Sequence, residues 1–493
     1  MFGEARAMTA ATAFDYRTAR ELVADLADGR VSSRELTERA IARIQALDGR
    51  VNAVVVRDFT RARAAAAAAD DALARGDRRP LLGLPLTVKE SYDVAGLPTT
   101  WGMPWFSDFH AATDAVVVER LKAAGAVLLG KTNVPFGLGD WQSYNAIYGT
   151  THNPWAMGRT PGGSSGGSAA ALAAGYVALE MGSDIGGSLR APAHYCGVYS
   201  HKPSRGVIPL RGHAPPRTFG GTPDLPVTGP LARSAADLAL ALDVLAGPDF
   251  IEAAGWRLEL PPPRHDRLAA YRVLVLDTHP LLPSDRHVRG ALNRLTERLQ
   301  ESGATVERAS PLLPDLVRLA RAFVGLLMPV IFARFPEDYQ KRMAEAAAAL
   351  PAGADDVPAW TLRGANAAHR DWLAADAERV LAAHQWHELF EKFDVVLFPP
   401  MPTPAFPQDE REDSASRTIE IDGTTYPYGD QVVYASLATA PGLPATTAPL
   451  EISETGLPVG VQIIGPYAGD RTTIRFAELL EESYGGFVPP PPL

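Results

Sequence analysis

The sequence contains little cysteine and no long hydrophobic run. Its one cysteine, Cys196, can form neither an internal disulfide nor a multi-cysteine metal site, so a reducing cytoplasm is the simplest compartment. The longest apolar stretch, residues 323–332, is about half of what a bilayer span requires and contains Pro329. Residues 1–23 contain no apolar run of the signal-peptide type. We therefore expect a soluble, cytoplasmic protein without a membrane partner.

Positive charge is also scarce. The 493 residues include 47 lysines and arginines against 57 aspartates and glutamates, which gives a net charge of −10. This balance argues against a sequence-wide electrostatic grip on nucleic acid. Hydrophobic residues make up 46% and charged residues 21% of the chain, a ratio that excludes wholesale disorder. We expect a folded protein with no nucleic-acid partner.

Helix-like and strand-like segments alternate along most of the chain. Residues 32–35 form a capping box for a helix, and apolar strands are expected at 82–90 and 126–130. Such alternation predicts an α/β fold with a large mixed β-sheet sandwiched between helical layers. Because no linker or repeat divides the chain, we expect a single domain over residues 1–493. Residues 311–393 are expected to be mostly helical.

The segment 158–190 is dense in glycine, serine and alanine. A flexible linker is one interpretation of such a composition. However, an alanine-rich helical stretch (168–174) and an apolar strand (176–181) interrupt the run. Small residues in a structured segment let backbones approach closely and give N–H groups access to a ligand. The pattern therefore favours a structured segment beside a ligand.

Three polar residues stand at the edges of apolar or glycine-rich segments, namely Lys89, Ser164 and Ser188. A lysine at the carboxyl end of a buried strand can lose its charge and serve as a base. Two glycines before Ser188 allow backbone N–H groups to converge on an oxyanion, and a helix opening at Ser188 toward Tyr195 would add the stabilisation of its dipole. A hydroxyl needs an adjacent base to become a nucleophile, and Ser164 could relay its proton to Lys89. Taken singly, each serine is more often a turn or cap residue and the lysine a solvated one.

Together these motifs resemble the amidase signature family of serine hydrolases. The resemblance is most specific in residues 84–205, a signature core that includes GGSSGGSAAALAAGYVALEMGSDIGGSLR. Weaker matches follow at 394–404 and 456–472. Residues 311–393 carry no matching motif and are interpreted as a variable region on the substrate side.

The resemblance implies the fold of the family and a Ser–cis-Ser–Lys triad. Ser188 would be the acyl-forming nucleophile, Ser164 the proton bridge and Lys89 the neutral base. The family pattern places a cis peptide bond at Ser164 without indicating on which side. Neither a metal nor an organic cofactor is implied.

The resemblance also assigns supporting roles to residues around this triad. They comprise the oxyanion-hole amides, side chains that brace the loops, and a wall of the substrate pocket. In this order they are Ile185, Gly186, Gly187 and Ser188; Ser165, Asp184 and Arg190; and Gly137 and Leu138.

The activity implied is hydrolysis of linear carboxylic amides to an acid and ammonia or an amine, with esters or carbamates as further substrates. The partner would be a small-molecule amide, and a homodimer stays open because dimers are frequent in the family. The sequence leaves open whether six apolar residues line a tunnel or form core: Phe323, Leu326, Leu327, Met328, Trp360 and Trp372. Ser183 stands where the family commonly has threonine, and His201 is expected to be structural.

Several alternatives compete with this interpretation. The amidase-like subunit of a tRNA-dependent amidotransferase shares the triad motifs but works in a complex. GGSSG also fits the nucleophile elbow of an α/β-hydrolase esterase, with Ser164 or Ser165 as nucleophile and a histidine as base. That fold requires an apolar strand directly before the elbow, and the preceding residues, 153–161, are loop-like.

Three weaker alternatives remain. Cys196 could serve a cysteine hydrolase, although a buried structural cysteine is the simpler interpretation. His384 and His387 could begin a zinc site, but no carboxylate pattern accompanies them. A catalytically silent binding protein on the same fold is disfavoured because all three candidate polar groups are present.

Overall fold

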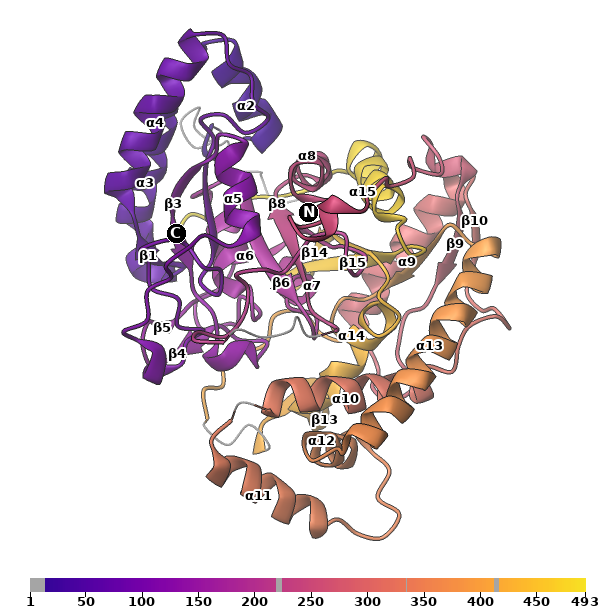
Figure 1. The fold of residues 1–493 in the computed structure, drawn as a ribbon. Coiled ribbons are helices and arrows are strands. Elements are labelled where there is room, and N and C mark those ends of the chain that lie inside the picture. The colour runs from indigo at the N-terminus through magenta and orange to yellow at the C-terminus, as the bar shows by residue number, and fades with distance from the viewer. Residues whose placement is uncertain (1–13, 219–223, 334, 412–415) are drawn as a thin grey trace.

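The computed structural model describes residues 14–218, 224–333, 335–411 and 416–493. Helices and strands alternate over most of this length (Figure 1). The helices are α2 Ala19–Ala27, α3 Ser33–Val51, α4 Phe59–Ala74, α5 Val116–Ala123, α6 Gly166–Ala173, α7 Arg190–Cys196, α8 Ala235–Leu245, α9 Arg286–Glu301, α10 Leu316–Phe332, α11 Glu337–Ala348, α12 Val357–Ala365, α13 His369–Lys392, α14 Val432–Thr439 and α15 Asp470–Tyr484.

The strands fall into one large sheet and two short hairpins. Those of the large sheet are β1 Val54–Arg57, β2 Pro85–Lys89, β3 Val127–Thr132, β6 Leu179–Asp184, β7 Tyr199–Lys202, β8 Val227–Ala232, β9 Arg272–Val275, β10 Thr305–Glu307, β11 Val395–Phe398, β14 Ala445–Ile452 and β15 Pro458–Ile464. The hairpins are β4 Tyr144–Asn145 with β5 Gly149–Thr150, and β12 Thr418–Ile421 with β13 Thr424–Pro427.

The large sheet has eleven strands in the order β1-β3-β2-β6-β8-β7-β14-β15-β11-β9-β10. β2 runs parallel to both β3 and β6, and β9 runs parallel to β10 and β11. Strands β8, β7, β14 and β15 pair antiparallel in the middle of the sheet. Helix α5 makes the crossover from β2 to β3, and α9 the crossover from β9 to β10. This confirms the mixed-sheet α/β fold predicted from the sequence.

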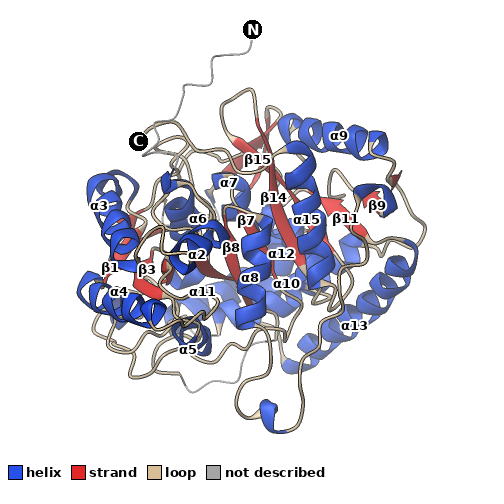
Figure 2. Ribbon diagram, turned by 90° about the horizontal axis from the view of Figure 1, so that it is seen from above, coloured by secondary structure: helices blue, strands red, loops and turns tan. Residues whose placement is uncertain are grey.

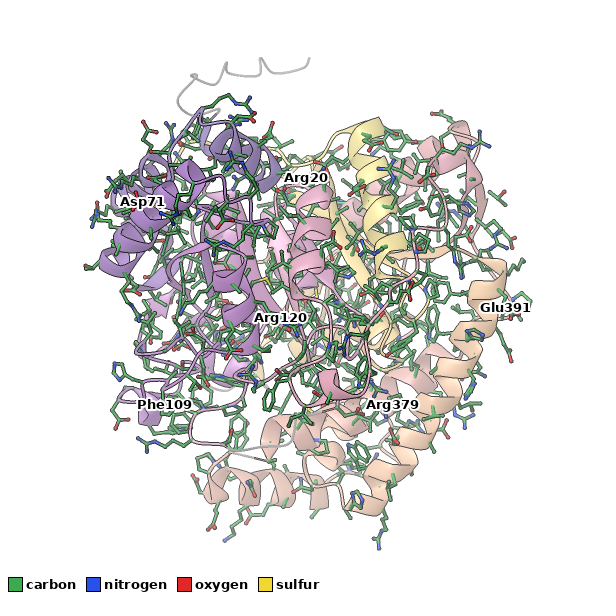
Figure 3. The ribbon with its side chains drawn as sticks, turned by 45° about the horizontal axis from the view of Figure 1, so that its top comes forward. Arg20, Asp71, Phe109, Arg120, Arg379 and Glu391 are labelled. Atoms are coloured by element: carbon green, nitrogen blue, oxygen red, sulfur yellow. The ribbon has the colours of Figure 1, made fainter. Side chains whose placement is uncertain are left out.

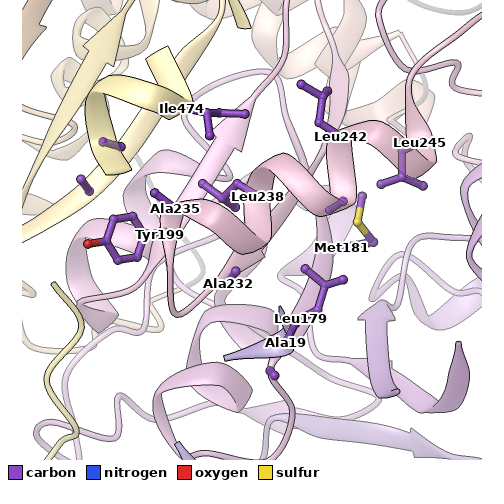
Figure 4. Packing of buried hydrophobic residues seen from close by; sticks show 14 of the residues in the cluster. Ala19, Leu179, Met181, Tyr199, Ala232, Ala235, Leu238, Leu242, Leu245 and Ile474 are labelled. Carbon is purple, nitrogen blue, oxygen red and sulfur yellow. The ribbon is translucent and has the colours of Figure 1, made fainter. Parts of the chain in front are cut away.

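Helices cover both faces of this sheet (Figure 2). α2, α5, α8 and α15 pack on one face, where their apolar side chains meet Leu179 and Met181 of β6. α6 and α7 pack on the other face, against Val127 and Leu129 of β3 and Leu231 of β8. Because side chains alternate along a strand, one sheet feeds two separate cores. Figure 4 shows part of the first core, in which Leu238, Leu242 and Leu245 of α8 belong to the same buried cluster as Met181 of β6.

Helices α10 to α13 form a third packed region beside the sheet (Figure 1). α10 lies against α12, α13 and α14, and its apolar side is buried with Val396 and Phe398 of β11. Pro329 stands near the end of α10, where Phe332 is its last residue. Residues 311–393 are mostly helical, as predicted from the sequence.

Three central strands were not predicted from the sequence: β7, β8 and β14. β7 reads YSHK and β8 reads VTGPLA, with glycine and proline in a position that normally argues against a strand. Both strands are fully buried between helices, so tertiary packing overrides their weak strand propensity. Helix α3, which the capping box opens, continues to Val51 and ends at Asn52 in the left-handed conformation.

No helix in the described ranges combines the length and the apolarity that a membrane crossing demands.

The packing of α8 gives a first prediction. Leu238 is fully buried between the sheet and α15, so Leu238→Ala should destabilise the protein by about 2–5 kcal/mol through lost contacts and a residual cavity. Leu381→Ala, on a side chain of α13 that is 44% exposed, is the matched control and should change stability by less than about 0.5 kcal/mol. Urea denaturation followed by circular dichroism measures both. Equal effects of the two substitutions would contradict the packing described here.

Candidate active site

Lys89 is the last residue of β2, and the topology of the sheet determines its neighbours. Val88 pairs with Met181 of β6, and Lys89 pairs with Thr132 of β3. Since these three strands are parallel, their carboxyl ends lie at one edge of the sheet, where ligands gather in open α/β folds. The edge brings Lys89 next to Ser183 and Asp184 at the end of β6.

The amine of Lys89 is enclosed by three hydroxyl groups. Its Nζ lies 2.6 Å from Ser164 Oγ, 3.0 Å from Ser165 Oγ and 3.0 Å from Ser183 Oγ. The side chain is completely buried. Burial lowers the pKa of Lys89 to about 7, although the negative charges of Asp184 and Glu180 oppose the shift. A large fraction of the amine is therefore uncharged near neutral pH, as a proton acceptor must be.

The glycine-rich segment that carries Ser164 is packed too tightly for side chains. A Cβ on Gly163 would lie 2.3 Å from the Asp140 carbonyl oxygen, and one on Gly167 would lie 2.4 Å from the Asn133 nitrogen. The peptide bond from Gly163 to Ser164 is cis, which answers the question that the sequence left open. The segment is not a linker: it leads directly into α6 and holds Ser164 almost fully buried.

Ser188 lies in a turn that the Asp184 carboxylate organises. Asp184 accepts hydrogen bonds from the backbone N–H groups of Gly187 (2.9 Å) and Leu189 (3.0 Å). It also pairs with the Arg190 guanidinium, whose Nη2 lies 2.9 Å from Asp184 Oδ1. Burial alone would raise the pKa of Asp184, but the positive charge and hydrogen bonds of Arg190 lower it to about 2. The carboxylate is therefore ionised throughout the neutral range.

Helix α7 begins at Arg190, two residues after Ser188, so Ser188 does not itself open this helix. The left-handed backbone of Gly187, with φ of 95°, turns the chain at this point. Ser188 thus lies on the turn itself and lines a cavity.

The backbone amides of this turn divide into two groups. The N–H of Gly187 is engaged by Asp184. Within the part of the chain that the structure describes, no protein acceptor pairs with the N–H groups of Ile185, Gly186 and Ser188. Three of the four amides expected in the oxyanion hole therefore remain available for a ligand oxygen.

Arg190 ties the turn to distant elements. Besides Asp184, the guanidinium donates to Thr439 Oγ1 of α14 (2.7 Å) and to Gln462 Oε1 of β15 (3.1 Å). The side chain is 1% exposed. Because each of these bonds fixes the guanidinium, the position of the Asp184 carboxylate, and hence of the Ser188 turn, is fixed as well.

A cavity of about 1570 Å³ opens onto these residues. Ser164, Ser188 and Ile185 line it, as do Gly137 and Leu138, the predicted pocket wall. The site residues named from the sequence thus all meet at one cavity or in the layer directly behind it.

Much of the remaining lining was not predicted. Residues 205–218, between β7 and β8, and parts of 248–256 border the cavity. They carry no recognisable motif, although loops longer than about 12–15 residues are commonly functional. Arg120 lies at the centre of Figure 3. It donates to the carbonyls of Gly247 (3.1 Å) and Pro248 (2.7 Å), at the start of the second of these segments. Phe109, also labelled there, lines the cavity on the N-terminal side.

Two buried titratable residues near Lys89 were also missed. Glu180, the second residue of β6, accepts hydrogen bonds from Thr87 Oγ1 and the Met181 N–H, and burial raises its pKa to about 7. His213 lines the cavity, with its Nε2 3.0 Å from Ser91 Oγ. Burial, reinforced by the charge of Lys89, lowers the pKa of His213 to about 3, so the ring is neutral.

Residues 311–393, interpreted from the sequence as a region on the substrate side, contribute only a few side chains to the cavity. Among its described residues, the end of α10, at Pro329–Ile331 and Ala333, and Phe335 line it. Of the six apolar residues that the sequence left open between tunnel and core, five are buried in the core around α10, and Trp372 packs against that core while partly exposed. The five are Phe323, Leu326, Leu327, Met328 and Trp360.

The competing sites lack the geometry they would need. Cys196 is fully buried and its Sγ donates to the Pro161 carbonyl, and burial raises its pKa. His201 is held between Thr446 Oγ1 (2.9 Å) and Asp470 Oδ1 (3.0 Å), which is a structural arrangement. The described residues 153–161, directly before GGSSG, do not form the strand that a nucleophile elbow would require.

The zinc alternative depends on His384 and His387 of α13. They line a small surface pocket together with Arg379, which is labelled in Figure 3. Among the described residues, no three histidine, cysteine, aspartate or glutamate side chains gather as metal ligands would.

Comparison with known proteins agrees with this geometry. A family model described as Amidase matches residues 35–474. The chain belongs to the Amidase family. It is 34% identical to a subunit of the glutamyl-tRNA(Gln) amidotransferase of Anaeromyxobacter sp. (strain K), over 96% of this chain and 97% of that protein.

Solved structures share this fold over nearly the whole chain. A bacterial aryl acylamidase of the amidase signature family superposes with a TM-score of 0.80 at 25% identity, covering 95% of this chain and 96% of the other. A protein from a vestigial complex related to an s-triazine catabolic enzyme superposes with a TM-score of 0.79 at 31% identity, over 96% and 100% of the two chains. Amide hydrolysis is the general activity that these similarities support.

The Asp184–Arg190 pair gives a second prediction. Arg190→Met leaves a buried carboxylate without its partner and should cost about 3–5 kcal/mol of stability. Arg471→Met, which breaks an exposed pair with Asp243, should cost at most about 1 kcal/mol. Thermal unfolding of the two variants provides the comparison. If both melt at the wild-type temperature, the pair does not hold the Ser188 turn in place.

Proposed function

We propose that this member of the Amidase family hydrolyses carboxylic amides through a covalent acyl-enzyme on Ser188. The observation that carries the proposal is the buried amine of Lys89, 2.6 Å from Ser164 Oγ, at a cavity that both Ser164 and Ser188 line. An uncharged amine in this position can accept a proton through a bridging hydroxyl, and a deprotonated serine can attack a carbonyl.

The hydrogen bonds around Lys89 support one direction for the proposed proton path. Ser165 Oγ donates to the Ser183 carbonyl (3.3 Å), so it can only accept from Lys89. A neutral amine has two N–H bonds and one lone pair. If the N–H bonds point to Ser165 and Ser183, the lone pair is left to accept the proton of the Ser164 hydroxyl. Ser164 is then free to accept the proton of Ser188.

The reaction follows from this arrangement. Ser188 Oγ bonds to the amide carbon while its proton passes through Ser164 to Lys89, and the oxyanion accepts hydrogen bonds from the N–H groups of Ile185, Gly186 and Ser188. The proton returns through Ser164 to the nitrogen as the C–N bond breaks, which releases ammonia or an amine. Water, deprotonated by the same path, then cleaves the ester of Ser188 and releases the acid. Esters and carbamates could follow the same steps.

A second candidate is the amidase-like subunit of an amidotransferase, as the name of the relative from Anaeromyxobacter suggests. Such a protein would pass ammonia on within a complex. Copurification of untagged partner subunits, and glutamine hydrolysis that depends on them, would favour this candidate. Hydrolysis of simple amides by the isolated chain would favour the stand-alone enzyme.

Replacement of the nucleophile gives the third prediction. Ser188→Ala should reduce amide hydrolysis by at least about three orders of magnitude and should abolish the acylated peptide that mass spectrometry detects after rapid quenching. Ser302→Ala, on a serine at the end of α9, serves as the control and should retain both. A covalent adduct that persists in Ser188→Ala would show that another residue is the nucleophile.

The pKa of Lys89 gives the fourth prediction. Protonation removes the lone pair, so kcat/KM should fall tenfold per pH unit well below an apparent pKa of about 7 and level off above it. Measurements from pH 5 to 9 with one neutral amide test this dependence. A rate that stays constant down to pH 5 would exclude a lysine base of this pKa.

A further inference from the structure

One wall of the cavity is built from aromatic side chains that come from three separate segments. Trp105 lies in the short 3-10 helix Pro104–Phe106, Phe136 begins a second such helix, and Phe335 follows α10. The ring centroids of Trp105 and Phe136 are 5.4 Å apart, and those of Phe136 and Phe335 are 6.0 Å apart. All three residues line the cavity. We refer to these three side chains as the aromatic wall.

The aromatic wall is supported from behind. The Phe335 ring stacks on Tyr339 of α11 at 4.8 Å and contacts Phe332 of α10 at 5.2 Å. The wall therefore joins the N-terminal segments that carry Trp105 and Phe136 to the α10–α11 region. Its position is set by ring-to-ring packing, and Trp105 keeps 47% of its surface exposed. When an apolar group of a ligand covers such a surface, apolar area is removed from water and the free energy of binding becomes more favourable.

The arginine side chains that line the cavity are each paired with a carboxylate. Arg205 pairs with Asp224, Arg217 with Asp108, and Arg211 with both Glu119 and Asp249. These are the three arginines that line the described part of the cavity. Because each of these guanidinium groups already has a carboxylate partner, they do not offer an unpaired positive charge to an anionic substrate. Near the candidate triad, Asp184 is likewise neutralised by Arg190.

We propose that the cavity selects uncharged amides that carry an aromatic ring or a long alkyl group, and that Trp105, Phe136 and Phe335 contact this group. The proposal builds on the proposed amide hydrolysis and names its substrate class. The scissile carbonyl is held at Ser188, and the apolar group lies along the aromatic wall, where ring packing and removal from water favour it over a small or charged group.

Binding to a variant that cannot react tests this proposal independently of catalysis. With Ser188→Ala as the background, isothermal titration calorimetry measures the affinity for four neutral amides: benzamide, butyranilide, acetamide and N-methylacetamide. The two ring-bearing amides should bind at least about tenfold more tightly than their small counterparts, and succinamate, which is anionic, should bind no better than acetamide.

Substitutions in the wall localise the effect. Phe136→Ala and Phe335→Ala should each weaken binding of the ring-bearing amides about two- to tenfold, as expected for the loss of one aromatic contact, and leave acetamide binding unchanged. Phe250→Ala is the matched control, because this ring is 68% exposed and lies outside the cavity. Phe136→Leu keeps the apolar volume and provides a second variant if the alanine variant does not fold.

The two proposals fail in different ways. Equal affinity for ring-bearing and small amides, or equal losses in Phe136→Ala and Phe250→Ala, would overturn the assignment of the wall even if the wild-type chain hydrolyses amides. Tight binding of ring-bearing amides without any hydrolysis by the wild-type chain would overturn the proposed function and leave the assignment of the wall intact.

Discussion

The desolvation of one amine is the constraint on which the site depends. In water the ammonium form of a lysine is strongly favoured, and a proton acceptor is obtained only by removing the solvent. Here Lys89 is fully buried at the end of β2 and meets three serine hydroxyls within 3.0 Å. Hydroxyls satisfy the hydrogen bonds of the amine without adding a charge that would restore the ammonium form.

The rest of the fold maintains this environment. Parallel pairing of β2 with β3 and β6 brings Lys89 and Asp184 to the same edge of the sheet. Glycines allow the segment around Ser164 to lie directly on its neighbours, where a single Cβ would clash. The ionised Asp184 carboxylate is taken up by Arg190 and by two backbone amides, which limits its pull on the Lys89 proton and shapes the turn that presents Ser188.

The capped helix near the N-terminus, the strand that ends at Lys89 and the structured glycine-rich segment could be predicted from the sequence, because each depends on a local pattern. The capping box at Ser32 and the strand ending at Lys89 follow from side-chain chemistry and apolar runs, and both are present in the structure. The central strands β7 and β8 could not be predicted in this way, since their residues become strand-like only when helices bury both faces. The turn before α7 depends on hydrogen bonds from Gly187 and Leu189 to the Asp184 side chain, which local sequence patterns do not indicate.

The cavity lining shows a second limit of sequence reasoning. Gly137 and Leu138 were found through a family resemblance, whereas Phe136 and Phe335 meet only because distant segments fold together. Phe323 and Trp360 belong to the core. From the sequence alone, these large apolar residues could equally have lined a pocket. The proposed substrate contacts therefore involve segments that are far apart in the sequence, whereas each proposed catalytic residue stands in a local motif.

The most direct measurement of the central claim is the titration of Lys89 itself. Nuclear magnetic resonance of the lysine ¹³Cε–¹Hε signals, with Lys89→Met used to assign the resonance, reports the protonation state of this amine without reference to catalysis. The Lys89 amine should titrate with a midpoint near pH 7. A midpoint near 10.5, the ordinary value for lysine, would mean that the amine stays charged at neutral pH and cannot accept the proton of a serine.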